Sequence, residues 1–463
     1  MHIGIDFGTS YSAAAAMVEG QLTLIRFGSA EQFRTAVFFP ELVPDPNDFE
    51  LTPSLQEQLE AQLRSARTLQ RQLAADAAAR GQVPVTARSE AELRTDALRV
   101  VRRQWMEEQT RQSAVSVASF QHALFGEDAV QAYLEAGGGN LIESPKSMFG
   151  FRLDPQVRKV IVHIATHILE HIRLTASQQL GVPVRGAVIG RPVEFRSSMG
   201  EKGSVQAVDI LREAAASAGF DTVSFLEEPA AAAMHYHKSL ASRQRAIIVD
   251  IGGGTTDVAY AELGGGQAPS ITRSWGLPKG GTDLDVGVSL HSFMPYLGKN
   301  VTAVPPHHFV EAASVHNLPK QREFQKQNYR LVPAPYAARL QALQQLGATT
   351  RLNQTAERMK ISLSGLDQHR ADLGFIEPGL AVQASSEDFH TAIAPFLAQM
   401  ERTLSTVRGD LDELPASVFI TGGTSRSPQV KAQVRASFPE IPLVEGDPSL
   451  GVVSGLAVAA SEV

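Results

Sequence analysis

The sequence contains no cysteine. This absence excludes disulfide frameworks, thiolate metal sites and cysteine nucleophiles. The first residues, MHIGIDFGTS, carry neither the basic nor the apolar segment of a secretory signal peptide. No run reaches the roughly 18 apolar residues that a membrane span needs. We therefore expect a cytoplasmic protein that does not use a membrane as a partner.

An excess of positive charge is also missing, because the 463 residues carry a net charge of −7 at pH 7. Nucleic acids and anionic membrane surfaces attract basic proteins, so neither is an expected partner. Hydrophobic residues make up 43% of the chain and charged residues 20%, which is typical of a globular protein. The Walker loop GxxxxGK[ST] is absent too, which excludes a P-loop mechanism.

A glycine-rich segment, IIVDIGGGTTDVAY at residues 247–260, predicts a β-hairpin: a buried strand, a turn and a returning strand. An ordinary hairpin needs one or two glycines, so three of them followed by two threonines indicate a backbone left bare for a close approach. Phosphate is the favoured ligand class, with a hydrated Mg²⁺ shielding it from Asp250 and Asp257. On its own, the segment fits a structural turn with solvated carboxylates equally well.

A second copy of the pattern stands at the start of the chain, in IGIDFGTSYSAAAAM. Asp6 precedes this turn as Asp250 precedes the other, 244 residues later. Two similar hairpins from two similar lobes can close on one triphosphate from opposite sides. The repeat therefore favours the phosphate interpretation.

The rest of the chain alternates strands and helices, which predicts an α/β architecture with mixed sheets. Residues 51–113 differ: apolar residues recur three and four positions apart, and Ser89 with Glu92 forms a capping-box pattern. We expect a helical hairpin inserted into the first lobe. Residues 157–180 predict a further helix, and residues 295–350 predict a second insertion or an extended loop–helix region.

Near the end of the chain, the segment SVFITGGTSRSPQV predicts a strand, two glycines, and a helix opened by Thr424 and Ser425. Exposed amides at a helix N-terminus bind anions and nucleotides. Strand–Gly–Gly–helix junctions also occur for packing reasons alone, so by itself this segment supports both interpretations.

Eight ordered segments together resemble the ATPase domain of the 70-kDa heat-shock protein chaperones. They are DFGTSYS, ESPKSMFGF, VIGRPVEF, FLEEPAAAA, DIGGGTTDVA, KGGTDLD, AERMKISLS and ITGGTSRSP. Within that family the chain is most similar to the short YegD-type chaperones. The resemblance implies an actin-like ATPase fold, in which two ribonuclease-H-like lobes enclose Mg²⁺ with ATP or ADP. The first lobe would span residues 1–244, the second 245–446, and a C-terminal segment with a helix near the hinge 447–463.

The resemblance also implies roles for individual residues. Asp6 and Asp250 would hold Mg²⁺ through its waters. Lys146 would face the γ-phosphate, Glu228 and Asp250 would orient the attacking water, and Thr255 would bond that water or the γ-phosphate. The residues implied for the phosphates are Gly8, Thr9, Ser10, Tyr11, Gly252, Gly253, Asp257, Gly280 and Gly281. Those implied for adenosine are Glu357, Lys360, Ser364, Gly422, Gly423, Arg426 and Asp447.

One position departs from the family pattern, because Ile361 stands where the chaperones usually have an arginine packed on the base. The match ends at Val463 without the linker and substrate-binding domain of those chaperones. The expected function is therefore slow ATP hydrolysis that drives a conformational switch, read by a client protein or co-chaperone. Two alternatives are an actin-like filament-forming ATPase and an acceptor-specific kinase of the same superfamily.

Histidine spacing gives a weaker signal. His163, His167 and His171 recur every four residues and share one helical face, but we interpret them as a solvated stripe because no carboxylate completes a metal site there. The adjacent pair His307 and His308 is no more specific as a metal-binding pattern.

Overall fold

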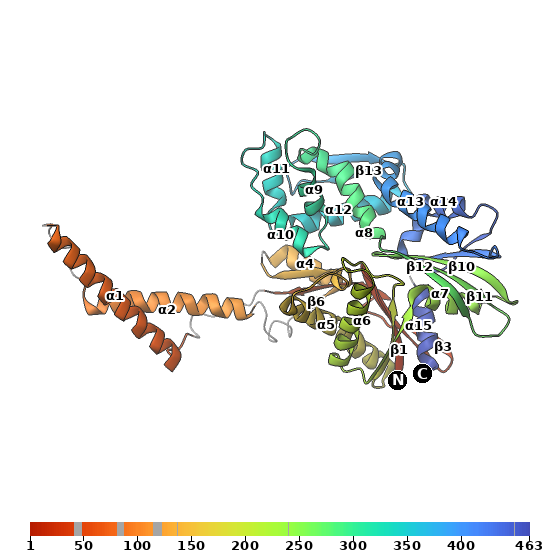
Figure 1. Cartoon of the computed structure of the whole chain (residues 1–463), viewed down its shortest axis with the longest axis horizontal. Helices are drawn as coiled ribbons and strands as arrows, with labels where there is room; N and C mark the ends of the chain where they lie inside the picture. Colours follow the sequence, from red (N-terminus) through yellow and green to blue (C-terminus); the bar gives the residue numbers. More distant parts are fainter. Residues whose placement is uncertain (41–48, 81–87, 114–122, 137, 239, 449) are drawn as a thin grey trace. The chain divides into compact units, whose positions relative to one another are not determined.

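The computed structural model describes residues 1–40, 49–80, 88–113, 123–136, 138–238, 240–448 and 450–463 (Figure 1). The chain divides into two compact units. The main unit comprises Met1–Phe38, Leu124–Gly137 and Leu141–Val463, and the helical unit comprises Phe39–Ala123 and Gly138–Asn140. Among the described residues, no helix combines the length and the apolar character that crossing a membrane requires.

The first sheet of the main unit has the strand order β3-β2-β1-β8-β9, with β4 paired to β2. β1 runs antiparallel to β2 and parallel to β8, and β9 extends the parallel side. The antiparallel pair is the hairpin predicted at the start of the chain. The strands are β1 (His2–Phe7), β2 (Tyr11–Val18), β3 (Gln21–Leu24), β4 (Gln32–Arg34), β8 (Gly186–Arg191) and β9 (Thr222–Glu227).

Small residues let the helix α15 (Gly451–Ser461) lie directly on this sheet, against β1, β2 and β8. A side chain at Gly4 would collide with the backbone of α15 at Leu456 and Ala457, so this approach requires glycine. The contact forms a buried cluster of Ala13, Ala15, Val453 and Ala457.

Three further helices accompany the first sheet: α5 (Pro155–Leu180), α6 (Glu201–Ser217) and α7 (Glu228–His237). α7 packs on α15, and α5 packs on α6. The predicted helix at 157–180 is confirmed, and its stripe of Ile161, Ile164, Ile168 and Ile172 is buried. α7 begins directly where β9 ends, because Pro229 in its first turn fits the start of a helix.

The second sheet has the order β12-β11-β10-β15-β16. β10 runs antiparallel to β11 and parallel to β15, so this sheet repeats the arrangement around β1. The hairpin predicted for residues 247–260 is confirmed, with Val249 opposite Val258 and Ile247 opposite Tyr260. The strands are β10 (Gln244–Ile251), β11 (Thr256–Leu263), β12 (Ser270–Leu277), β15 (Ser417–Thr421) and β16 (Leu443–Glu445).

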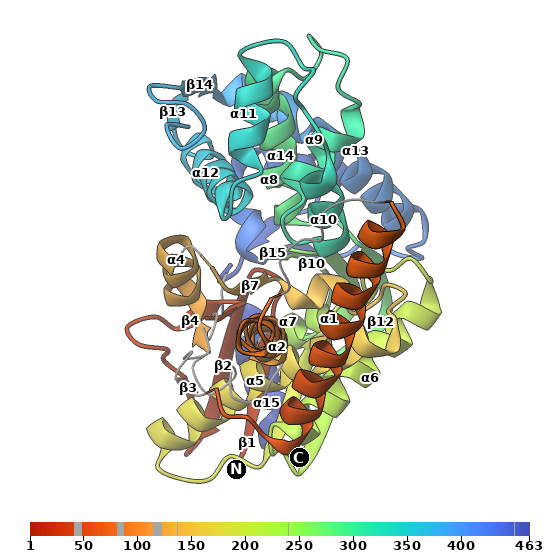
Figure 2. The ribbon, with the colours of Figure 1, turned by 90° about the vertical axis from the view of Figure 1, so that its left-hand side faces the viewer.

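The second sheet shares one large core with the helices that follow it, which Figure 2 shows gathered on their own side of the main unit. Residues 295–350 form a loop–helix region, as one of the two predictions for them stated, and they pack into this core through Phe309, Phe324 and Leu340. The elements are α8 (Gly281–Val288), η3 (Ser289–Phe293), η4 (Met294–Leu297), α9 (Pro306–Ala313), α10 (Leu318–Lys326), α11 (Tyr336–Leu343), α12 (Ala348–Leu363), β13 (Gln368–Asp372), β14 (Ala381–Ser385), α13 (Ser386–Gly409), η5 (Gly423–Arg426) and α14 (Pro428–Ser437).

The junction after β15 differs from its prediction. Thr424 and Ser425 lie in the short 3-10 turn η5, and the α-helix α14 begins only at Pro428, after Ser427. Proline fits the first helical position because its missing N–H has no partner there. The glycines therefore lead into a tight turn before the helix.

A smaller sheet has the order β6-β5-β7 and is followed by short helical elements. The bounds are β5 (Ala36–Phe39), β6 (Leu124–Phe125), α4 (Gly126–Ala136), β7 (Asn140–Glu143) and η2 (Pro145–Met148). The last element, η2, carries Lys146, which is buried.

The helical unit is the hairpin predicted for residues 51–113, made of α1 (Pro53–Ala79) and α2 (Glu90–Ser113). Ser89 and Glu92 form the predicted capping box, with reciprocal hydrogen bonds of 2.8–3.3 Å. The apolar stripe of α1 is buried only in part: Leu59 and Leu63 pack against α2 residues, whereas Leu69 and Leu73 are exposed. Gly81, the predicted end of the first helix, lies outside the described residues.

Candidate functional site

A cavity of about 580 Å³ lies in the main unit, between residues of the two hairpin turns. Its volume is in the range of small-molecule sites. Asp6 and Asp250 both line it, so the two similar turns meet at one site. The other predicted residues on its wall are Gly8, Thr9, Ser10, Tyr11, Lys146, Glu228, Gly252, Gly253, Thr255, Gly281, Glu357, Lys360, Ser364, Gly422, Gly423 and Arg426.

The two turns touch each other, which gives the glycines a second explanation. A side chain at Gly253 would collide with Ser10, and one at Gly254 would collide with Thr9. The second turn must therefore lack side chains at these positions so that the hydroxyl side chains of the first turn can pack against its backbone. The prediction from the sequence explained these glycines only by the close approach of a ligand.

Hydrogen bonds fix the carbonyl groups of the second turn. Gly252 O accepts from Gly281 N at 2.9 Å and from Thr424 Oγ1 at 2.9 Å. Gly253 O accepts from Thr282 N at 2.8 Å, and Gly254 O from Arg196 Nε at 2.8 Å.

A trans peptide points its N–H opposite to its C=O. The amides of Gly253 and Gly254 therefore face away from α8, and the amide of Thr255 faces away from Arg196. Consecutive amides directed in this way form an anion-binding concavity.

Buried carboxyl groups dominate the base of the site. Burial, and then the charge of Glu228, raise the pKa of Asp6 to about 7, while Lys146 lowers it. The pKa of Asp250 is raised well above its ordinary value by burial and by Glu228, Asp257 and Asp6. Burial raises the pKa of Asp257 to about 8, although the Val193 amide donates to its Oδ1 at 2.7 Å.

Lys146 is the cation within this acidic cluster. Its Nζ donates to Glu228 Oε1 at 2.6 Å, and both side chains are more than 90% buried. Burial lowers the pKa of Lys146, but the charges of Glu228 and Asp6 outweigh it, so the pKa is raised. Asp257 Oδ2 is buried without a hydrogen-bond partner among the described residues. The surplus of carboxyl groups suits a divalent cation that prefers oxygen ligands.

The far wall of the cavity comes from α12 and the residues just after it. Glu357, Lys360 and Ser364 share one face, as predicted. Glu357 accepts from Arg34 Nη2 at 2.6 Å, and Lys360 Nζ lies 2.8 Å from Asp285 Oδ1. Ile361 also lines the cavity, and 64% of its surface is exposed.

Three predicted residues are not among those that line the cavity. Asp257 is buried behind the second turn, facing Val193. A side chain at Gly280 would meet Gly252 O at 2.6 Å, so this glycine supports the turn from behind. Asp447 accepts from Leu450 N through Oδ1 at 2.9 Å, just before α15.

Arg34 is the main residue that sequence reasoning missed. From β4 it donates to Tyr11 Oη at 3.1 Å, to Glu127 at 2.8 Å and to Glu357 at 2.6 Å. It thus links the first turn to α12, across elements that are far apart in sequence. No sequence motif includes Arg34, so its linking role is apparent only from the distances between its guanidinium group and these three side chains.

The predicted histidine stripe on α5 is only partly solvated. The ring of His171 stacks on Phe125, with centroids 4.5 Å apart and planes 6° apart, and it also contacts Phe27 and Phe33. Burial lowers the pKa of His171. The solvated interpretation is therefore wrong for this residue, which is a packing group.

Comparison with known proteins identifies relatives. Residues 155–300 match the family model described as Hsp70 protein. The chain is 27% identical over 316 residues to human "Heat shock 70 kDa protein 13", which covers 64% of each chain. It is 29% identical over 306 residues to "Chaperone protein dnaK3" of Synechocystis, covering 64% of this chain and 34% of that protein.

Residues 155–300 thus match an Hsp70 family domain, and Hsp70 and DnaK proteins are homologues of the chain at 27–29% identity. It spans less than two thirds of the length of these relatives. The mixed α/β architecture agrees with the fold that the resemblance implied. The closer similarity to the YegD type stays a prediction.

Proposed function

We propose that this protein binds ATP and hydrolyses it slowly, as a nucleotide-driven conformational switch of the Hsp70 type. One observation carries the proposal: two turns of similar sequence, each following an aspartate at the end of a strand, line one cavity. The actin-like fold would then have its lobes at residues 1–244 and 245–446, each built on one of the two mixed sheets. The segment 447–463 would connect them near the hinge.

The phosphates of ATP would lie between the turns. The amides of Gly253, Gly254 and Thr255 and the hydroxyls of Thr9 and Ser10 supply donors for the phosphate oxygens. The carboxyl groups of Asp6 and Asp250 fit a hydrated Mg²⁺, which binds oxygen and gives up its water reluctantly. When bound, Mg²⁺ would neutralise charge on the phosphates.

The chemistry would use the buried pair Lys146 and Glu228. Because the pKa of Lys146 is raised, its ammonium stays charged and can stabilise the negative charge that develops on the γ-phosphate. Glu228 or Asp250 would accept a hydrogen bond from the attacking water, and Thr255 would hold the water or the γ-phosphate. Water would then attack the γ-phosphorus while the bond from the γ-phosphorus to the β,γ-bridging oxygen breaks. The products would be ADP and inorganic phosphate, and the proton of the water would pass to a neighbouring carboxylate or to solvent.

Adenosine would lie between α12 and the Gly422–Gly423 turn. Lys360 and Ser364 offer polar contacts on one wall, and the exposed Ile361 offers an apolar surface for one face of the base. A conformational change driven by hydrolysis would be read by a client protein or co-chaperone in the cytoplasm.

A steady-state assay with and without Mg²⁺ tests the proposal. Asp250→Asn removes a carboxylate from the cation site, and Lys146→Ala removes the buried positive charge. Each should lower turnover by about 100-fold or more, as expected for the loss of a group that stabilises the transition state. Glu262→Gln, a partly exposed position on β11 away from the cavity, is the control. Unchanged turnover in both site variants would contradict the proposed roles.

A further inference from the structure

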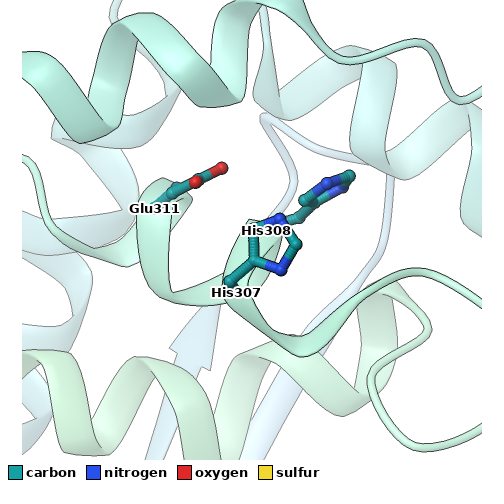
Figure 3. Close-up of side chains that lie close together, drawn as sticks. All are labelled: His307, His308 and Glu311. Atoms are coloured by element: carbon teal, nitrogen blue, oxygen red, sulfur yellow. The ribbon is translucent and has the colours of Figure 1, made fainter.

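A second cluster of potential ligands lies on α9, away from the residues that line the cavity. One ligand atom each from His307, His308 and Glu311 lies within 4.8 Å of the other two (Figure 3). An α-helix turns about 100° per residue, so Glu311 projects between the two histidines, one turn further along. The three side chains therefore share one face of this helix.

The helix is held firmly by its opposite face. Phe309 and Ala312 are buried in the core of the main unit, and α9 packs against α10 and α12. The directions of the three side chains are therefore set by the fold. A site built on a packed helix needs less ordering when an ion binds.

Glu311 supplies an independent observation. Its Oε2 is buried and has no hydrogen-bond partner in the described part of the chain. Leaving a carboxylate oxygen enclosed and unpaired is costly. The described residues place no ion pair on it either. A bound cation would compensate this charge.

Tyr329 provides the second hydrogen bond that the ring of a metal-binding histidine usually makes. Its hydroxyl lies 3.3 Å from His308 Nδ1, and the tyrosine is buried against the same core. A hydrogen bond at one ring nitrogen fixes the orientation of the imidazole and leaves the other nitrogen for a metal ion. The contact with Tyr329 thus restrains the orientation of the His308 ring.

We propose that His307, His308 and Glu311 bind a divalent cation of the zinc class. Two imidazole nitrogens and one carboxylate oxygen suit Zn²⁺ or Co²⁺, whereas Mg²⁺ and Ca²⁺ prefer oxygen ligands throughout. Three protein ligands leave one tetrahedral position to water. This site is distinct from the cavity in which the carboxyl groups of Asp6 and Asp250 favour Mg²⁺.

The test is a titration of the full chain, without a histidine tag, with Co²⁺ in the presence of excess Mg²⁺. Mg²⁺ occupies oxygen sites, so the visible absorption of Co²⁺ reports a site with nitrogen ligands. We expect one Co²⁺ per chain, displaced by Zn²⁺. His307→Gln and Glu311→Gln should each weaken binding at least tenfold, in line with the loss of a ligand.

The control is His163→Gln, which alters the histidine stripe of α5 and should leave Co²⁺ binding unchanged. His307 is exposed, so its replacement leaves the core intact, and circular dichroism checks the fold of each variant. Absence of binding in excess Mg²⁺ would overturn the proposal. Wild-type affinity for Co²⁺ in His307→Gln and Glu311→Gln, or loss of binding in His163→Gln, would overturn it too.

Discussion

The two hairpin turns at the cavity have similar sequences but are held in different ways. The second turn, at Gly252–Thr255, is fixed by hydrogen bonds to three of its carbonyl groups, from α8, η5 and Arg196. The first turn is held from β4: Thr35 N donates to Ser10 O at 2.8 Å, and Arg34 bonds Tyr11. The second turn is thus held by bonds to three carbonyl groups, whereas the first turn is held by one backbone bond and the Arg34 side chain.

The comparison shows where the site can change. The carbonyl bonds of the second turn hold the backbone itself, so this turn moves together with α8, η5 and Arg196. The first turn is connected to α12 through a charged side chain, Arg34, whose partner Glu357 lies across the site. An ion pair of this kind can break and reform while both sheets stay intact. The following predictions test this contrast.

The largest expected effect comes from filling the space between the turns. Gly253→Ala places a methyl group against Oγ, Cβ and N of Ser10, so the hydroxyl must rotate away and the two turns must shift apart to relieve the remaining contacts. Displacing reacting groups by about 1 Å can cost on the order of 100-fold in rate, and we expect a loss of ATP turnover of that size. The measurement is single-turnover hydrolysis at saturating ATP.

The matched control is Gly409→Ala, because a side chain there meets nothing within 4 Å. It should leave turnover unchanged. Full activity of Gly253→Ala would mean that the contact between the turns is not needed for function.

A smaller effect is expected at the link between the first turn and α12. Arg34→Gln removes the charge that bonds Glu357 at 2.6 Å, in a setting where both side chains are largely buried. Charge-assisted hydrogen bonds contribute about 1.5–3 kcal/mol, so ADP should dissociate roughly tenfold faster or more. Stopped-flow release of a fluorescent ADP analogue measures this rate.

Arg26→Gln serves as the comparison, because its contact with Glu31 is long and exposed. A double-mutant cycle with Glu357→Gln isolates the pair. If Arg34→Gln and Glu357→Gln have fully additive effects on ADP release, the ion pair does not connect the two sides.

The smallest effect concerns the pH dependence of stability without nucleotide. The pKa of Asp6 is about 7 in the folded protein, against 3.8 for an ordinary aspartate. Between about pH 4 and pH 7, the folded state therefore holds a proton that the unfolded chain has released. The free energy of unfolding is therefore higher at low pH, where Asp6 is protonated in the folded protein, and it falls as the pH rises to about 7.

Asp6→Asn removes the titration while keeping the shape of the side chain. Its free energy of unfolding relative to the wild type should rise as the pH increases from about 5 to 7, by on the order of 1 kcal/mol per pH unit. Urea unfolding at both pH values measures the difference. A constant difference would show that the Asp6 carboxyl group titrates normally.

The sequence allowed the local elements of the site to be predicted because they depend on neighbouring residues. Glycines, hydroxyls and alternating apolar residues within a dozen positions predict each hairpin. The helical face of α12 follows from the spacing of Glu357, Lys360 and Ser364. The Hsp70 resemblance then indicated that these segments, far apart in the chain, belong to one site.

The remaining features depend on contacts between distant residues. The link from Arg34 to Glu357 spans 323 positions, and the collision between Gly253 and Ser10 appears only when the two sheets are together. The histidines of α9 gave no signal as an adjacent pair, because the third ligand and the buried oxygen of Glu311 emerge from the packing of one helix. The stripe on α5 misled for the same reason: spacing alone does not show that His171 stacks on Phe125.

The packing of α15 against β1 has a consequence for biosynthesis. One face of β1 is shaped, at Gly4, for a helix that is made some 450 residues later. Until residues 451–461 emerge, α15 cannot cover that apolar surface, so β1 must wait for α15 to complete its packing. A nascent chain stalled before residue 451 should therefore bind a hydrophobic dye that the released protein excludes.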